Sequence, residues 1–545
     1  MSDVTSDQVL TTQDGKPLKA ALAKALRRER LRSLMLIAPL LIFIMLTFVA
    51  PIFDMLFRSV ENQIVSETLP RTVVLLEEWD AGSGETPGED VYQALHYDLM
   101  IASEYKRHTQ LGTRLNYEKT GISSMFRRTG RRIADFGEVY ADQFAALNPA
   151  WEDPMTWVNL MASDAWIADQ QRWAASQDGP EPTFILSETA VAALPATADI
   201  YGAFAEFLQM EEGDSPTDEQ PWNAVYAALY EDLADNPQAF STFSGTNADL
   251  LREAVEAVPT FATASMKELF IDAEDGWGDA GNWAVIKTFS PAYTPGYFLS
   301  AADAQLTPDG LEMKPENQQI YLFLFYRTLL LSIVITLSCL LLGYPIAYLL
   351  AALPLRYSNL LLILVLLPFW TSLLVRTSAW KVLLQQQGVI NDVLVWIGLI
   401  TDAGRLVMIN NATGTIIAMT HILLPFMILP LYSVMKTISP TYVRAAKSLG
   451  ATDWTAFWRV YFPQSVPGIG AGAILVFILA IGYYITPELV GGTSGIFISN
   501  RIAFHISSSL NWGLAAALGT LLLVAVLLLF MAYDRIVGID NVKLG

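Results

Sequence analysis

The sequence predicts an all-α membrane protein with six transmembrane helices and a large, mainly α-helical insert after the first of them. The chain of 545 residues is 53% hydrophobic, yet its formal net charge is −20. Residues 61–320 hold about 43 of the 54 acidic residues and about 14 of the 34 basic ones. Apolar and acidic residues therefore occupy different parts of the chain, which fits a membrane part and a soluble part.

Six apolar runs predict the transmembrane helices, because a bilayer core requires about 20 apolar residues per helix. The runs are 34–57, 328–353, 360–374, 415–435, 468–485 and 513–533. The third run contains Pro368 and the fifth contains several glycines. Since broken helices persist in membranes only where they line protein or water, we expect these two to lie near a transport path.

The runs divide the chain into a cytoplasmic segment (1–33), a first transmembrane helix (34–58), an acidic insert (59–318) and a core (319–545). The first apolar run begins too late and is too long for a signal peptide, so we expect an uncleaved membrane helix. Within the insert, patterns such as NADLLREAVEAV predict helices, RTVVLLEEW has strand-like alternation, and 212–221 predicts a loop. Because Cys339 is the single cysteine, burial alone must hold the insert together.

Basic residues near the ends of the runs predict the orientation. Those before the first run are Lys16, Lys19, Lys24, Arg27, Arg28, Arg30 and Arg32. They indicate a cytoplasmic N-terminus, so six crossings place the insert in the periplasm and the C-terminus, with Arg535 and Lys543, inside. Arg376, Lys381, Arg405 and Arg501 fall outside, so the rule holds for the majority of basic residues. We expect a multi-pass protein of the bacterial inner membrane.

The loop between the fourth and fifth runs, 439–463, has helix signals around a break. Ser439 and Pro440 are typical of a helix start, and Gly450 is typical of a helix end. A second amphipathic run, 454–462, is followed by Pro463. The pattern predicts two short helices that meet at a glycine and form a knob able to dock into a cleft of a soluble partner.

The residues of this loop resemble a known motif. Ala445, Ala446, Gly450 and the distal Pro463 are similar to the EAA loop of bacterial ABC importer permeases. The segments GYPIAYLLA, LLPFWTSLLVRTSAWKVLL, ILLPFMILPLYSVM and PELVGG resemble the spermidine/putrescine (PotB-like) family of permeases. The resemblance covers roughly 318–535 and the first helix, and it leaves out the insert.

The resemblance implies a type I importer half that works with a second permease subunit, two ABC ATPase subunits and a periplasmic solute-binding protein in the lipid bilayer. It implies import by alternating access of a small, cationic solute, such as putrescine or spermidine. Related permeases carry opines, iron, thiamine or amino-acid derivatives, which stay open as alternatives. The partner ATPase would bind ATP and Mg²⁺, so no cofactor is expected in this chain. No nucleic-acid partner is expected either.

One position departs from the family motif. The family has a glutamate where this chain has Arg444, and in the family that acidic residue helps to anchor the loop to the ATPase. The ion pairing must therefore differ here. Either the groove of the partner carries an acidic residue, or Asp453 and its neighbours take over.

Polar and aromatic groups within the membrane are candidates for a substrate path. A polycation needs carboxylates and aromatic faces for cation–π contact. The residues that meet this need are Phe369, Trp370, Thr371, Tyr483, Tyr484 and Glu488, with Glu488 as the carboxylate. The alternative interpretation is an interfacial aromatic belt with an acidic helix end. His421 is either a pore residue or, more in keeping with its surroundings, a packed histidine bonded to a backbone carbonyl.

No catalytic motif is recognisable in the sequence: there is no G-x-S-x-G, no paired-histidine motif and no P-loop. We therefore expect no metal site, and ATP hydrolysis by another chain. The insert is expected to dock the binding protein, to concentrate cations through its negative field, or only to cap the permease. The rival class is a membrane-anchored periplasmic enzyme or sensor, which would need a catalytic cluster between residues 61 and 318.

Overall fold

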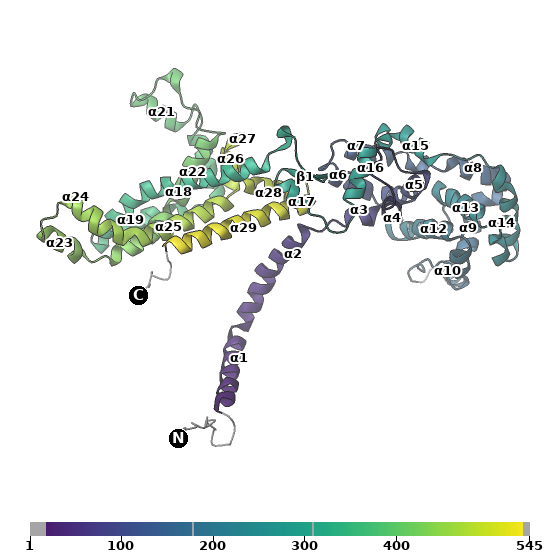
Figure 1. Cartoon of the computed structure of the whole chain (residues 1–545), viewed down its shortest axis with the longest axis horizontal. Coiled ribbons are helices and arrows are strands. Elements are labelled where there is room, and N and C mark those ends of the chain that lie inside the picture. Colours follow the sequence, from purple (N-terminus) through teal and green to yellow (C-terminus); the bar gives the residue numbers. More distant parts are fainter. Residues whose placement is uncertain (1–17, 177–178, 308–309, 538–545) are drawn as a thin grey trace, which may run out of the picture. The chain divides into compact units, whose positions relative to one another are not determined.

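The computed structural model describes residues 18–176, 179–307 and 310–537, and these are mostly helical (Figure 1). Lys16 and Lys543, which were used to predict the orientation, lie outside the described residues. The strands of the described part are β1 (Ala304–Thr307) and β2 (Gly310–Met313), which pair as an antiparallel hairpin. The chain forms two compact units, one that runs through Val60 and resumes at Leu324, and one that spans Glu61–Phe323.

The first unit is the membrane unit. Five of its helices are long and apolar enough to span a bilayer, or six spans result if one bent pair counts as a single span. The five stretches are Glu29–Arg58, Tyr321–Ala352, Ala412–Thr437, Asp453–Gly482 and Trp512–Tyr533. In Figure 1 they appear as α1 (Leu18–Ile44) with α2 (Ala50–Arg58), α18 (Tyr321–Ala352), α22 (Ala412–Thr437), α25 (Phe462–Gly482) and α29 (Trp512–Val537).

The bent pair is the predicted third span. It consists of α19 (Leu355–Leu366), a 3₁₀ turn at Leu367–Trp370 and α20 (Leu373–Leu383), with 94° between the two parts. Pro368 stands in the 3₁₀ turn, and the Ser372 hydroxyl accepts a hydrogen bond from Val375 N at 3.2 Å, which starts α20. The first part of the pair ends at Trp370, close to the predicted end of the span at residue 374, and a new helix begins at Leu373.

The helix α22 forms the centre of the membrane unit. Of its apolar span 61% is buried, and it packs closely against α25. A Cβ atom at Gly472 of α25 would lie 2.7 Å from Met427 Sδ and 3.1 Å from Met427 O, so a larger residue would displace the methionine side chain and crowd its carbonyl. The first span, by contrast, is 0% buried within the chain. Its apolar side chains require lipid or another subunit to cover them.

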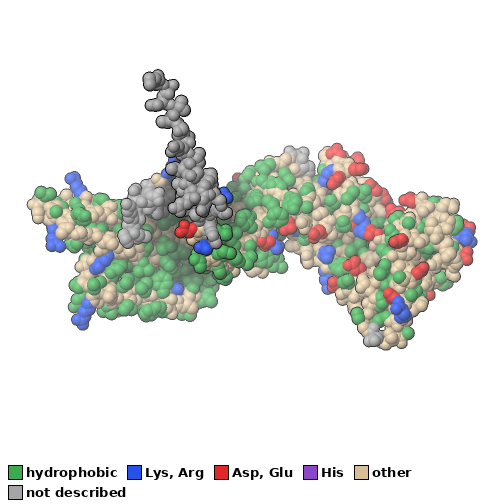
Figure 2. Space-filling view, turned by 90° about the horizontal axis from the view of Figure 1, so that it is seen from below, with side chains coloured by type: hydrophobic (Ala, Val, Ile, Leu, Met, Phe, Trp, Pro, Cys, Tyr) green, Lys and Arg blue, Asp and Glu red, His purple; other side chains and the backbone are tan. Residues whose placement is uncertain are grey.

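The second unit, Glu61–Phe323, contains the acidic insert and is helical as predicted. Its helices are α3 (Ile64–Thr68), α4 (Pro70–Leu76), α5 (Glu89–Glu104), α6 (Arg107–Leu115), α7 (Ile122–Thr129), α8 (Glu138–Leu147), α9 (Pro154–Met161), α10 (Asp164–Ser176), α11 (Glu188–Ala193), α12 (Pro195–Phe207), α13 (Asn223–Asp235), α14 (Thr246–Ala257), α15 (Met266–Ala273), α16 (Ala280–Thr288) and α17 (Gly296–Ala301). Tryptophans dominate its core, and Trp151, Trp157, Trp277 and Trp283 are fully buried. Acidic side chains are scattered over its surface, whereas hydrophobic side chains cover much of the membrane unit (Figure 2).

The strand-like segment RTVVLLEEW is a helix, α4, and the strand interpretation of it is wrong. Pro70 occupies the first turn, and the buried Asp98 of α5 accepts hydrogen bonds from Arg71 N (3.0 Å), Thr72 N (2.8 Å) and Thr72 Oγ1 (2.7 Å). A carboxylate at the N-terminus of a helix satisfies its free N–H groups and offsets its dipole. The cap comes from a distant helix, so local alternation could not reveal it.

We expect Asp98→Ala to destabilise the insert by about 3 kcal/mol, because three buried donors and the Arg71 guanidinium lose their acceptor. Urea unfolding of the purified protein, followed by tryptophan fluorescence, measures this change. The control is Asp249→Ala, which removes an exposed carboxylate paired with Arg252 and should leave the urea midpoint unchanged.

Candidate coupling loop and transport path

The loop after α22 begins with a short capped helix, α23 (Pro440–Ser448). The Ser439 hydroxyl accepts a hydrogen bond from Thr441 N, and Pro440 stands in the first turn, where its missing N–H costs nothing. The helix start that the sequence predicts at Ser439 and Pro440 is therefore observed.

Gly450 ends α23 through two main-chain hydrogen bonds. Ala451 N donates to Ala446 O at 3.1 Å, and Gly450 N donates to Lys447 O at 3.0 Å. This is the Schellman arrangement, which requires the left-handed conformation that Gly450 adopts at φ = +92°. Glycine is needed here because a Cβ atom raises the energy of that conformation.

The second half of the loop differs from the prediction. The amphipathic run does not stop at Pro463, because α24 (Asp453–Ala456), a π turn at Phe457–Tyr461 and α25 form one stretch from Asp453 to Gly482. In the π turn Phe462 N donates to Phe457 O, one residue further back than in an α-helix. Pro463 follows this widened turn and stands in the first turn of α25. The loop is thus one short helix joined directly to a membrane helix.

Bulky apolar side chains cover the tip of the loop. Leu449 is 89% exposed and Trp454 is 72% exposed, beside the break at Gly450. An ion pair between Lys447 and Asp453 joins the two sides of the break. Asp453 is therefore already bound within the loop, whereas Arg444 is exposed and forms no ion pair with any described residue. This surface is suited to insertion into a partner cleft that offers an apolar pocket and an acidic group.

The first group of predicted path residues surrounds the bend between α19 and α20. Trp370 is 73% exposed, Thr371 is exposed and donates from Oγ1 to Pro368 O at 2.8 Å, and Phe369 lies edge-on to Phe426 of α22 at 5.0 Å. Phe369 is thus anchored to the central helix, and Trp370 presents its indole ring outside the chain.

The second group lies where α25 ends and α26 (Ile485–Val490) begins. Asn500 of α28 (Ile498–Ser507) donates from Nδ2 to Glu488 Oε2 at 2.7 Å and to Tyr484 O at 2.9 Å. The hydroxyl of Ser499 donates to Tyr483 O at 2.7 Å. The side chains of α28 thus hydrogen-bond the carbonyls of Tyr483 and Tyr484, which follow the end of α25, and Asn500 orients Glu488, which stays exposed.

Two contacts that the sequence did not indicate hold these segments. The hydroxyls of Thr377 in α20 and Thr486 in α26 lie 3.2 Å apart, and both residues are fully buried, so the second half of the bent third span meets the short helix after the fifth span there. Trp380 Nε1 donates to His421 Nδ1 at 3.1 Å. The expected bond from His421 to a backbone carbonyl is therefore replaced by a bond to an indole. Asn500 was also missed, because a lone asparagine after a glycine-rich loop gives no recognisable signal.

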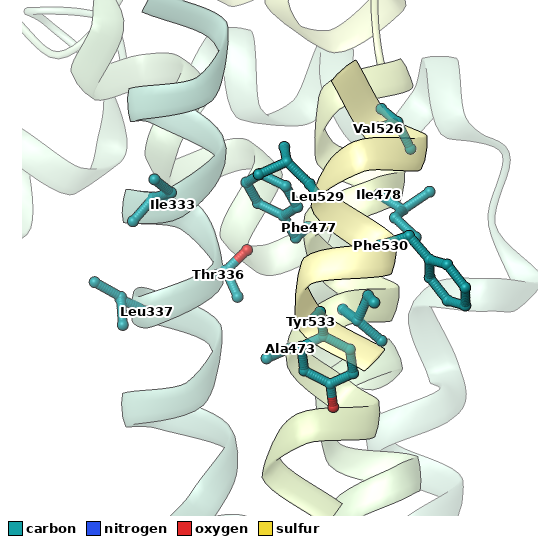
Figure 3. Close-up of a pocket in the computed structure, with 11 residues that line it drawn as sticks. Ile333, Thr336, Leu337, Ala473, Phe477, Ile478, Val526, Leu529, Phe530 and Tyr533 are labelled. Atoms are coloured by element: carbon teal, nitrogen blue, oxygen red, sulfur yellow. The ribbon is translucent and has the colours of Figure 1, made fainter. Parts of the chain in front are cut away.

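An apolar cavity of about 240 Å³ lies between α18, α25 and α29 (Figure 3). Its walls include Ile333, Leu337, Phe477, Leu529 and Tyr533. None of the six predicted path residues lines it, and it offers no charged group. Its chemistry fits a lipid chain or a packed helix and not a polar solute.

The helix bundle, with its bent third span and its capped loop, defines the class as a multi-pass helical membrane protein. Residues 316–539 match the family model of the binding-protein-dependent transport system inner membrane component. The chain is 36% identical over 226 residues to the spermidine/putrescine transport system permease protein PotB of Salmonella typhimurium, which covers 42% of this chain and 78% of that protein. It is 30% identical over 262 residues to the inner membrane ABC transporter permease protein YdcU of Escherichia coli, and this match covers 45% of this chain and 80% of that protein.

This chain belongs to the family of binding-protein-dependent transport system inner membrane components and is an ABC importer permease subunit of the PotB-like type. It is a transporter subunit of the inner membrane and not an enzyme. A solved chain of a bacterial alginate ABC transporter in complex with alginate pentasaccharide-bound periplasmic protein is also similar, with 19% identity and a TM-score of 0.36 over 41% of this chain and 80% of that chain.

We expect Asn500→Leu to destabilise the membrane unit by about 2 kcal/mol, because the Phe497 N–H loses its acceptor Asn500 Oδ1 and Tyr484 O keeps only its bond from Glu488 N. Thermal unfolding in detergent measures the change. Ser507→Ala removes one exposed hydrogen bond from the same helix and should leave the midpoint unchanged. An equal midpoint for both variants would contradict the bridging role of Asn500.

Proposed function

We propose that this permease subunit forms half of the membrane path of an ATP-driven importer for a small organic cation of the polyamine type. The observation that carries the proposal is the 36% identity to a spermidine/putrescine permease over 78% of the length of that protein. The exposed carboxylate of Glu488 supports it, because a polycation that crosses the membrane needs an anionic partner in an otherwise apolar environment.

The aromatic residues around Glu488 support the same solute class. Tyr484 is exposed beside it, and Trp370 is exposed at the bend of the neighbouring broken span. Each contact between an ammonium group and an aromatic face contributes about 0.5–2 kcal/mol of binding free energy. In this proposal Phe369, Thr371 and Tyr483 shape the path, and Trp370, Tyr484 and Glu488 contact the solute.

In this proposal the subunit works with a second permease subunit, two copies of an ABC ATPase that bind ATP and Mg²⁺, and a periplasmic solute-binding protein. ATP binding closes the ATPase dimer, the loop 439–463 carries this movement, and the bundle changes the side to which it opens. The exposed tip residues Leu449 and Trp454 support a docking role for the loop, with Ala445, Ala446, Gly450 and Pro463 as its structural positions. The uncovered apolar face of the first span supports a second membrane subunit.

The proposed orientation places both termini and the loop 439–463 in the cytoplasm and the insert in the periplasm. It rests on the lysines and arginines before the first span and on Lys436, Arg444, Lys447 and Arg459 in the loop.

We expect Glu488→Ala to lower the uptake of radiolabelled putrescine about tenfold, equivalent to about 1.4 kcal/mol, because the ammonium group loses its counter-charge. The assay uses proteoliposomes that contain the assembled transporter. Glu253→Ala removes a carboxylate of the insert and serves as the control. Unchanged uptake by Glu488→Ala would return Glu488 to the role of a helix-end residue.

We expect Gly450→Val to uncouple ATP hydrolysis from uptake while the protein remains in the membrane. A β-branched residue in the left-handed region costs about 1–2 kcal/mol and opens the Schellman turn. The number of ATP molecules hydrolysed per solute imported measures the effect. Gly450→Asn is the matched control, because asparagine tolerates this conformation and should preserve coupling. Normal coupling in the valine variant would contradict the role of the loop.

A further inference from the structure

The insert contains one three-part arrangement twice. Its first part is a helix that starts at Leu-Pro-x-Thr, at Leu69–Thr72 and again at Leu194–Thr197. Its second part is the helical pattern Val-Tyr-x-Ala-Leu-x-x-Asp-Leu, at 91–99 and at 225–233. Its third part is the turn Trp-x-Asp-x-x-x-Trp, at 151–157 and at 277–283.

The same helix cap occurs in both copies. Asp98 accepts hydrogen bonds from Thr72 N at 2.8 Å and Thr72 Oγ1 at 2.7 Å. Asp232 accepts the equivalent bonds from Thr197 N at 2.7 Å and Thr197 Oγ1 at 2.6 Å. Both carboxylates are buried, and each closes the first turn of a helix that begins with proline.

The same aromatic contacts also occur in both copies. The Tyr92 hydroxyl donates to Trp277 O at 2.6 Å, and the Tyr226 hydroxyl donates to Trp151 O at 2.7 Å. Within each turn the second indole donates to the carbonyl of the first tryptophan at 2.9 Å. Matching sequence, caps and aromatic contacts together indicate an internal duplication.

In each repeat, the tyrosine helix does not contact the tryptophan turn that comes next after it in the sequence. Tyr92 bonds to the later tryptophan turn and Tyr226 to the earlier one. Isolated β-bridges agree, since Glu61 pairs with Tyr293 and Ala162 pairs with Leu186. One copy, the terminal repeat, is thus built from both ends of the insert (α3–α5 with α15 and α16). The other, the central repeat, is built from its middle (α8 and α9 with α11–α13).

The two repeats differ at one helix face. In the central repeat, Val158 and Ala162 follow the second tryptophan and are covered by the buried Trp166, which lies edge-on to Phe184 at 5.0 Å. The equivalent residues of the terminal repeat, Ala284 and Thr288, line a cavity of about 460 Å³. In the central repeat Trp166 therefore covers this helix face, whereas in the terminal repeat the equivalent face borders the cavity.

The cavity combines apolar and polar walls. Its lining includes Glu118, Lys119, Ala284, Thr288, Gln305 and Thr307. The Glu118 side chain is only 4% exposed, and its Oε1 accepts one hydrogen bond from Arg114 Nη1 at 2.7 Å. A carboxylate has about four acceptor positions, so it retains capacity for a further donor. The volume lies within the range of about 300–1,000 Å³ that is typical of small-molecule sites.

The two charged side chains that line the cavity each have an ion-pair partner, Arg114 for Glu118 and Asp279 for Lys119. Lys119 donates to Asp279 at 2.6 Å, and this hydrogen bond lowers the pKa of the Asp279 carboxyl, so the charge of the lysine is offset by a carboxylate. The segment before α5 lines the cavity with Ala81, Gly82 and Gly84, and it also carries Asp80 and Glu85. The field of the whole insert is negative, with about 43 acidic residues against about 14 basic ones in 61–320.

We propose that this cavity of the insert binds a small aliphatic ammonium ion, with Glu118 as its counter-charge and the wall of Ala284 and Thr288 as the contact for its methylene groups. The site lies in the insert and is separate from the path residues of the membrane unit. The inference goes beyond the uptake proposal, because binding here requires no ATPase and no transport.

The test is hydrogen–deuterium exchange mass spectrometry of the full-length protein in nanodiscs, with putrescine as the probe. We expect putrescine to slow exchange in residues 80–85 and 280–288, which border the cavity. Glu118→Gln and Thr288→Leu should each raise the putrescine concentration needed for half-maximal protection at least tenfold. The first removes the counter-charge, and the second fills the cavity without touching Arg114.

Glu256→Gln, which changes the charge of an exposed acid of the insert by the same amount, should leave this protection unchanged. Tryptophan fluorescence checks that each variant remains folded. The proposal is overturned if putrescine gives no protection in either segment, if Thr288→Leu binds like the unmodified protein, or if the dicarboxylate glutarate protects the segments instead. Since Glu488→Ala should not alter this protection, the result is independent of the uptake assay.

Discussion

The membrane unit depends on one constraint of the bilayer: a backbone N–H or C=O group in hydrocarbon must find its hydrogen-bond partner inside the protein. The spans α18, α22 and α29 meet it as long helices. The bent third span and the segment after the fifth span also use side chains, since Ser372 caps α20 and Ser499 and Asn500 donate to Tyr483 O and Tyr484 O just after α25. At both places a polar side chain supplies a hydrogen bond where a helix starts or stops.

The same constraint explains why the candidate path lies at the breaks. A continuous apolar helix offers no polar atom to a solute, whereas a break leaves carbonyls, hydroxyls and charged ends near the surface. Glu488 shares the Asn500 amide with Tyr484 O, so the group that closes the break also orients the carboxylate. The buried contact between Thr377 and Thr486 holds α20 against α26. Asn500 therefore both binds the backbone after α25 and positions the carboxylate that is proposed to contact the solute.

The insert follows a different principle, since it is held together by buried tryptophans and helix caps instead of lipid. Its terminal repeat joins the two ends of the inserted chain, with Asn62 N bonded to Ala292 O at 2.8 Å and Asn62 Nδ2 bonded to Phe289 O at 2.6 Å. The ends of the insert thus lie together, which suits a domain placed between two consecutive membrane helices. Only the central repeat is a continuous piece of chain.

Hydrophobic run lengths and the motif around Gly450 determined by themselves that the chain is a helical permease with a capped loop, because these features depend on neighbours in the sequence. Tertiary structure alone decided the partners of Glu488 and His421, the continuation of the helix through Pro463, and the helical state of the segment after Pro70. The duplication was also decided there, although its motifs stand in the sequence. Its equivalent contacts, from Tyr92 to Trp277 and from Tyr226 to Trp151, join segments that are far apart in the sequence. Hydrogen bonds and burial depend on distance in space, so no local sequence pattern predicts these pairs.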